Sequence, residues 1–294
     1  MGPLLAHIGS TLGEAVGRRV DLRMAHEVGG GGINRAFRAG DGDRSWFVKV
    51  NDASRADMFA AEAEGLQALE RGPLRVPSVA CRGEALGHSF LVLEWLDFGA
   101  GAPADYARLG EQLARLHALA GQRYGWERDN YIGSTPQANG ADASWPRFFA
   151  QARLAPQLAL ARSNGHAGLI ARGERLLEAL PQLFGAHAPR PSLLHGDLWH
   201  GNAAFLADGT PVIFDPAAYY GDRETDLAMT ELFGGFPEDY YAAYRALAPL
   251  DAGYGVRKTL YNLYHILNHA NLFGGGYVAQ AGRMIAQLLA ELKG

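Results

Sequence analysis

The spacing of hydrophobic residues changes from a strand-like period to a helix-like period along the chain. Residues 25–50 read as three strands, because apolar and polar residues alternate over 45–50 and turn residues occupy 40–43. Residues 89–96 form another apolar, strand-like run. Helical spacing then dominates, so we expect an α+β protein with a small antiparallel sheet first and a mainly helical remainder. The helices predicted in this second part cover residues 105–120, 146–160 and 168–183.

A further helix is expected just after the third strand, where Phe59, Glu62, Leu66 and Leu69 share one face. A carboxylate on such an apolar face is costly unless it is paired. Lys49, which lies inside an apolar strand, is the obvious partner. A strand lysine with a helix glutamate is the pair that kinases use to hold ATP phosphates. The alternative is two unrelated surface charges.

A run of glycines at residues 29–32 precedes Ile33 and Asn34. A Walker A loop needs Gly-Lys-Ser/Thr at the start of a helix, and these glycines lead into a strand. A glycine loop between antiparallel strands is the way kinases cover phosphates, although a plain loop fits the same residues. The strand at 89–96 leads into a glycine-rich stretch that suits a hinge. There the backbone of residues 94–96 is a candidate for the adenine edge, with a simple core strand as the alternative.

The chemistry concentrates in residues 192–215, which read SLLHGDLWHGNAAFLADGTPVIFD. Asp197 is followed after five residues by Asn202, and two short apolar runs joined by Ala-Asp-Gly-Thr predict a hairpin. Folding of that hairpin carries Asp215 back beside Asn202 and Asp197. Oxygen ligands of this kind suit Mg²⁺ bound together with phosphates. Asp197 is left to accept a proton, as in kinase-type phosphoryl transfer. A turn with solvated acids is the alternative.

Other polar clusters are weaker candidates. Asp222 and Asp226 are interpreted as residues that cap a helix and hold the catalytic loop, rather than as metal ligands. His265 and His269 lie four residues apart, but no His-Glu-x-x-His pattern accompanies them, so we do not predict a metal site there. Tyr261, His265, Asn268 and Leu272 share a helix face, for which a polar contribution to an acceptor cleft and plain packing both remain open. The segment 121–146 has little helical period and is interpreted as a long loop, which suits acceptor recognition or packing over the core.

Composition limits the class of protein. The chain has 294 residues, of which 48% are hydrophobic and 20% charged, as is typical of globular proteins. A net charge of -4 argues against a general nucleic-acid binder. A single cysteine, Cys81, excludes an intramolecular disulfide framework and fits a reducing cytosol. No signal peptide, myristoylation pattern or membrane-spanning run is apparent, so we expect a cytoplasmic protein without a membrane partner.

Four stretches carry a family resemblance: LLHGDLWHGN, IFDPAAYYGDRETDLAM, YIGSTPQAN and GGGINRAFR. Together they resemble the fructosamine kinase, or ketosamine-3-kinase, family, within the group that has the aminoglycoside phosphotransferase and protein-kinase-like fold. The resemblance extends over residues 29–277. It implies a bilobal fold, with a nucleotide-binding lobe at 1–96 and a catalytic, acceptor-binding lobe at 97–294.

The resemblance also implies an activity. Members phosphorylate the 3-hydroxyl of a sugar ketoamine on an amine, such as a glycated lysine, with ATP and Mg²⁺. The phosphorylated adduct then falls apart and frees the amine, which is deglycation. Ribulosamines, erythrulosamines and fructosamines are the expected acceptors, with bacterial members expected to favour the first two. A monomer or weak homodimer is expected. The nucleotide loop lacks the cysteine that some members use for redox-linked dimerisation, so that regulation is not predicted.

Residue by residue, the family pattern implies one catalytic base, Asp197. The other expected site residues fall into three groups: metal ligands, nucleotide contacts and acceptor contacts. The implied metal ligands are Asn202 and Asp215. The implied nucleotide contacts are Gly30, Gly31, Gly32, Ile33, Asn34, Lys49 and Glu62. The backbone of Glu94, Trp95 and Leu96 is the further nucleotide candidate, from the strand that leads into the hinge. The candidate acceptor contacts are His195, Trp199, His200, Asn268 and Phe273. Position 200 departs from the family, because many members are expected to have serine there.

Two other functions fit parts of the pattern. One is a small-molecule kinase for an aminoglycoside, a choline-like alcohol or a sugar, because these kinases share the HGDxxxxN element. The other is a nucleotide-binding pseudokinase that serves as a scaffold. The intact set of lysine, glutamate, two aspartates and asparagine argues against a pseudokinase.

Overall fold

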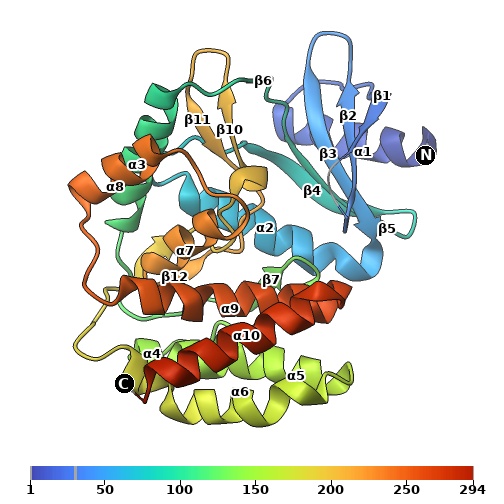
Figure 1. Cartoon of the computed structure of the whole chain (residues 1–294). Coiled ribbons are helices and arrows are strands. Elements are labelled where there is room, and N and C mark those ends of the chain that lie inside the picture. Colours follow the sequence, from blue (N-terminus) through green and yellow to red (C-terminus); the bar gives the residue numbers. More distant parts are fainter. Residues whose placement is uncertain (1, 30–31, 294) are drawn as a thin grey trace.

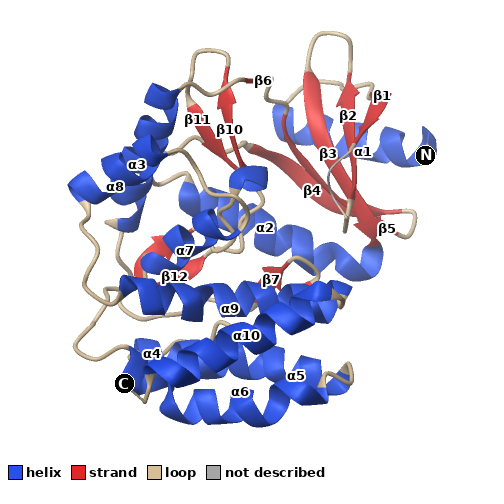
Figure 2. Ribbon diagram, viewed as in Figure 1, coloured by secondary structure: helices blue, strands red, loops and turns tan. Residues whose placement is uncertain are grey.

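The computed structural model describes residues 2–29 and 32–293, and it divides into a strand-rich part and a helical part (Figures 1 and 2). The strand-rich part is a five-stranded antiparallel sheet in the order β1-β2-β3-β5-β4. The prediction of three strands in residues 25–50 is confirmed, and so is the strand that ends near the expected hinge. The strands are β1 (Arg23–Val28), β2 (Arg35–Gly40), β3 (Ser45–Asp52), β4 (Val79–Ala85) and β5 (His88–Glu94).

Two helices cover opposite faces of this sheet. Helix α1 (Gly2–Val16) packs on Val48 and Val50 of β3, whereas α2 (Ala56–Leu69) packs on the face that carries Leu91 and Leu93 of β5. Because side chains alternate along a strand, Lys49 points away from α1 and toward α2. The pleat of β3 therefore aims the lysine at the helix that carries Glu62. Helix α1 is absent from the sequence prediction, although Leu4, Leu5, Ile8 and Leu12 have helical spacing.

The helical part is built around α9, which packs against α5, α7 and α10 (Figure 1). Most residues along the middle of α9 are buried, so this helix forms the centre of the larger core. The predicted helix at 105–120 is confirmed as α3, three residues shorter at its C-terminal end. The helices are α3 (Pro103–His117), α4 (Trp145–Phe148), α5 (Ala155–Ser163), α6 (Ala167–Ala179), α7 (Glu224–Leu232), α8 (Glu238–Leu247), α9 (Tyr254–Phe273) and α10 (Gly276–Glu291).

Three small sheets follow the five-stranded sheet along the chain. The predicted catalytic hairpin is confirmed, since β10 pairs with β11 in antiparallel register and β6 joins on the other side. The boundary expected after residue 96 falls in the connection between β5 and β6. The remaining strands are β6 (Phe98–Gly99), β7 (Asn130–Ile132), β8 (Thr135–Gln137), β9 (Ser192–Leu194), β10 (Ala203–Leu206), β11 (Pro211–Ile213) and β12 (Tyr219–Gly221).

Two sequence expectations need correction. The segment 121–146 is not irregular throughout, because β7 and β8 form a hairpin whose tight turn uses Gly133 at a φ of 61°. The helix expected at 146–160 is interrupted by a π-helical turn over Phe149–Leu154. Within residues 2–29 and 32–293, none of the helices combines the length and apolar composition that crossing a bilayer requires.

The contact between α3 and α8 depends on a glycine. A Cβ atom added at Gly110 would lie 2.2 Å from the backbone oxygen of Tyr240, which cannot move as a side chain would. We expect Gly110→Ala to lower the free energy of unfolding by about 1–3 kcal/mol, as overpacked cores do. Urea denaturation measures this change. Gly282→Ala is the control, because its Cβ would make only ordinary contacts in α10 and alanine favours a helix. Equal stability of the two variants would contradict the analysis.

Candidate active site

The structure brings Lys49 of β3 and Glu62 of α2 into direct contact. The ammonium nitrogen Nζ of Lys49 lies 2.7 Å from Oε1 of Glu62, and both side chains are largely buried. Burial alone would lower the pKa of Lys49, but the carboxylates of Asp215 and Glu62 raise it above its ordinary value. The lysine therefore stays positively charged in the site.

Asp215 provides the second carboxylate beside this lysine. Its Oδ1 lies 2.6 Å from Nζ of Lys49, and its side chain is about half exposed, at 46%. The backbone of Asp215 has a φ of 57°, in the left-handed region that non-glycine residues rarely adopt. Such backbone strain is concentrated at functional sites. The sequence placed Asp215 beside Asn202 but did not anticipate its ion pair with Lys49.

Asn202 and Asp197 are joined across the catalytic loop. The side-chain nitrogen of Asn202 donates to the backbone oxygen of Asp197 at 2.9 Å and to its carboxylate Oδ2 at 3.2 Å. Since the amide nitrogen takes both bonds, the amide oxygen of Asn202 faces the other way. The backbone N–H of Phe214 donates to the backbone oxygen of Asn202 at 3.1 Å. This bond holds the residue that precedes Asp215 beside Asn202. Burial and the nearby charge of Asp215 raise the pKa of Asp197 to about 7.

These residues form one wall of a cavity of about 200 Å³. Asn202 and Asp215 both line it, and amide and carboxylate oxygens are the hard ligands that Mg²⁺ prefers. Lys49 supplies the positive charge of the same cavity. The cavity lining includes Ile33, Asn34, Lys49, Glu62, Asp197, Asn202 and Asp215.

The loop that carries Asp197 is held in place by the buried carboxylate of Asp226. The backbone N–H groups of His195 and Gly196 each donate to its carboxylate at 2.8 Å, and His117 lies 3.1 Å from it. Burial alone would raise the pKa of Asp226, but the bond from His117 and its neighbours lowers it. These bonds confirm the prediction that Asp226 holds the catalytic loop, although it lies within the first turn of α7 rather than capping it. Gly196 is required, because an added Cβ would lie 2.1 Å from the backbone oxygen of Ala217.

A second cavity of about 280 Å³ adjoins the first, and Asp197 and Trp199 line both. Aromatic rings form much of its wall, with Trp199 against Phe233 and Phe233 against His269 at centroid distances of 5.7 and 5.1 Å. Phe273, at 67% exposed, stands at its rim. Asn268 also lines this cavity and donates to the backbone of Ile132 at 3.3 Å.

His265, for which the sequence left an acceptor cleft and plain packing both open, lines this second cavity. Its ring is 5% exposed, and among the described residues its Nδ1 has no hydrogen-bond partner. That nitrogen lies 3.9 Å from Oδ1 of Asp197. Burial and the adjacent His269 lower the pKa of His265 to about 3, so the ring is neutral. Its position on the buried face of α9 gave no sequence signal that distinguished this role from packing.

Other expected site residues lie elsewhere. His195 is fully buried, and its Nε2 lies 2.9 Å from the backbone oxygen of Phe214. This corrects the expected acceptor contact, because the ring holds the backbone next to Asp215 instead. His200 is exposed and packs on Trp199, outside the linings of both cavities.

The expected nucleotide contacts are only partly brought together. Gly30 and Gly31 lie outside the described residues, Gly32 is exposed, and Ile33 and Asn34 line the first cavity. At Glu94 the backbone N–H donates to Ser78 at 2.9 Å and the carboxylate is paired with Arg75, so an adenine contact there stays a prediction for the backbone carbonyl oxygen alone. Trp95 and Leu96 line neither cavity, and their contact with adenine stays a prediction.

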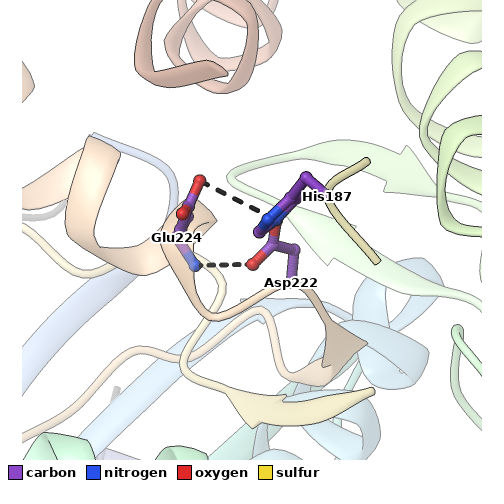
Figure 3. Close-up of side chains that lie close together, drawn as sticks. All are labelled: His187, Asp222 and Glu224. Carbon is purple, nitrogen blue, oxygen red and sulfur yellow. Dashed lines mark hydrogen bonds and ion pairs between the residues drawn. The ribbon is translucent and has the colours of Figure 1, made fainter. Parts of the chain in front are cut away.

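A separate cluster joins His187, Asp222 and Glu224 (Figure 3). His187 Nε2 lies 2.7 Å from Asp222 and 3.9 Å from Glu224, and Figure 3 shows the three side chains facing one another. Glu224 is also paired with Arg257 at 2.7 and 2.9 Å, and Tyr261 donates to Asp222. Because these oxygens already have cationic or N–H and O–H partners, the cluster is a structural ion network rather than a metal centre.

This network makes stability depend on pH. Burial alone would lower the pKa of His187, but hydrogen bonds to Asp222 and Asp251 and the charge of Glu224 raise it. A raised folded-state pKa gives stability that is fully present below the unfolded value of about 6.5. That stability is lost as the pH rises through the folded-state pKa. We therefore expect His187→Gln to destabilise the protein more at pH 5.5 than at pH 8.5, by urea denaturation. An equal loss at both values would contradict this.

Comparison with known proteins gives a consistent result. The fructosamine kinase family model matches residues 4–291. A probable ketoamine kinase of Synechocystis is 49% identical over 96% of each chain. A chloroplastic protein-ribulosamine 3-kinase of Arabidopsis thaliana is 42% identical over 94% of this chain and 86% of its own. The crystal structure of a putative fructosamine-3-kinase from Haemophilus somnus superposes with a TM-score of 0.88 at 32% identity, over 96% of each chain.

Proposed function

Because the chain belongs to the fructosamine kinase family, we propose that it is an ATP-dependent ketosamine 3-kinase. It transfers the γ-phosphate of ATP to the 3-hydroxyl of a sugar ketoamine. The observation that carries the proposal is the position of Asp197 between two adjoining cavities. One cavity has the cationic and oxygen groups that suit a nucleotide phosphate. The other has the aromatic and polar lining that suits a sugar derivative.

On the nucleotide side, Lys49 neutralises the α- and β-phosphates, and Glu62 holds it in place. Asn202 and Asp215 would hold Mg²⁺, which neutralises phosphate charge when it is bound. Asp215 also contacts Lys49, so the lysine and the proposed metal ligands are fixed relative to one another. Most of the rate gain then comes from positioning and charge stabilisation.

On the acceptor side, Asp197 accepts the proton of the attacking hydroxyl. Its pKa of about 7, raised by burial and by Asp215, matches the range in which a general base works best. Asn202 holds one carboxylate oxygen through its amide nitrogen, which leaves the other oxygen toward His265 and the second cavity. Trp199 and Phe233 provide apolar faces for the sugar carbons.

The acceptor proposed for this second cavity is a ribulosamine, an erythrulosamine or a fructosamine. It is free or attached to a protein lysine. The exposed ring of Phe273 lies at the rim of the cavity, where the amine substituent of an acceptor would leave the protein. Release of the amine after phosphorylation makes deglycation the proposed outcome.

We expect Asp197→Asn to reduce turnover of ribulose-lysine by about 10²- to 10⁴-fold, the range for loss of a general base. ATP still binds, because Lys49, Glu62 and Asp215 are unchanged. Phosphate transfer is measured with ribulose-lysine and fructose-lysine, beside kanamycin and choline, and ATP affinity by calorimetry. Near-normal turnover in the variant would refute the role of Asp197. Preference for kanamycin or choline would refute the acceptor class.

Asp215→Ala tests the metal site. We expect this variant to weaken Mg·ATP binding about tenfold or more, because a ligand that carries a negative charge is lost. Affinity for ATP in the presence of a chelator should change little, since Lys49 keeps its pairing with Glu62. Calorimetry with and without Mg²⁺ separates the two effects. An unchanged affinity for Mg·ATP would count against Asp215 as a ligand.

A further inference from the structure

Helix α2, which carries Glu62, is held by a residue from the helical part of the protein. Arg128 precedes strand β7, which lies next to α2 (Figure 1). Its Nη1 donates to Oε1 of Glu64 at 3.1 Å, and its Nη2 is paired with Asp57. Tyr131 donates to the other oxygen of Asp57 at 3.1 Å. Two acidic residues of α2 are thus bound by one short segment of the chain.

The spacing of these contacts fixes the rotation of the helix. Asp57 and Glu64 are seven residues apart, about 340° of helical rotation, so they share one face. Glu62 lies five residues after Asp57 and is turned about 140° from it, toward Lys49. Between these two directions, Gly65 packs closely on Pro216, because an added Cβ would lie 3.1 Å from that ring. Rotation of α2 that moved Glu62 away from Lys49 would therefore break the contacts of Arg128.

The backbone of Arg128 is itself fixed by the core. Its carbonyl oxygen accepts a hydrogen bond from the side chain of Asn139 at 3.2 Å. Asn139 is buried, and its amide oxygen accepts from Arg153 at 2.7 Å. Arg153 is fully buried over the ring of Tyr219, 4.0 Å from its centroid. A continuous chain of contacts therefore joins the core of the helical part to the exposed side of α2.

We propose that Arg128 is a positioning residue for ATP binding, which acts by keeping α2 in the orientation that pairs Glu62 with Lys49. The inference rests on the proposed role of that pair in holding ATP phosphates. Arg128 and Asp57 are 32% and 55% exposed, so their ion pair contributes little to the free energy of unfolding. Its effect lies in the geometry of the site, and its loss changes ATP affinity more than stability.

The test is Arg128→Gln. We expect the KM and the calorimetric Kd for ATP to rise about threefold to thirtyfold, the range for couplings transmitted through packed elements. The KM for the acceptor and the melting temperature should stay close to those of the wild type. Arg128→Lys should restore ATP affinity in part, since it keeps one charged donor. Arg147→Gln is the matched control, because the guanidinium of Arg147 pairs with Asp142 and so with no residue of α2.

A double-mutant cycle separates this role from general destabilisation. Asp57→Asn with Glu64→Gln removes the partners on α2 and should weaken ATP binding as Arg128→Gln does. Combining all three changes should add nothing further, because the same interaction is already lost. Additive losses, or unchanged ATP affinity in Arg128→Gln, would overturn the proposal. ATP affinity is measured without an acceptor, so failure of the acceptor panel leaves this result interpretable.

Discussion

The buried ammonium group of Lys49 is the interaction on which the site depends. It lies between the carboxylates of Glu62, on helix α2, and Asp215, in a loop 166 residues further along the chain. A buried cation without partners is strongly unfavourable, whereas two close carboxylates offset the loss of hydration. The sheet, helix α2 and the catalytic hairpin must therefore meet at one point. This single requirement sets how the strand-rich and helical parts fit together.

Around that point, the backbone of the catalytic loop is fixed by buried polar groups. The carboxylate of Asp226 accepts hydrogen bonds from two backbone N–H groups of the loop. The ring of His195 is hydrogen-bonded to the backbone oxygen of Phe214, the residue before Asp215. Each group is expensive to leave unpaired inside the protein, so the loop has one well-defined conformation. That conformation places Asp197 on the boundary between the two cavities and tolerates the unusual backbone of Asp215. Rigid support of this kind is what phosphoryl transfer by positioning requires.

Membership of the fructosamine kinase family and the geometry of the site lead to the same chemistry. The first cavity has charge for a nucleotide, and the second has aromatic faces for a sugar derivative. The second cavity also contains His265, a neutral ring whose Nδ1 has no hydrogen-bond partner among the described residues. Selectivity among ketosamines is therefore expected to arise from α7 and α9, which line that cavity, rather than from the nucleotide side.

The sequence by itself determined the parts of the site that are close together along the chain. The spacing of Asp197, Asn202 and Asp215 around a hairpin, and Glu62 on an apolar helix face, predicted their neighbours because turn geometry and helical period act locally. Only the tertiary structure decided which distant residues meet them. Arg128 reaches α2 across more than sixty residues, and His195 turns inward to a backbone oxygen rather than outward to an acceptor. Such contacts depend on how whole elements pack, and no local pattern of residues encodes that packing.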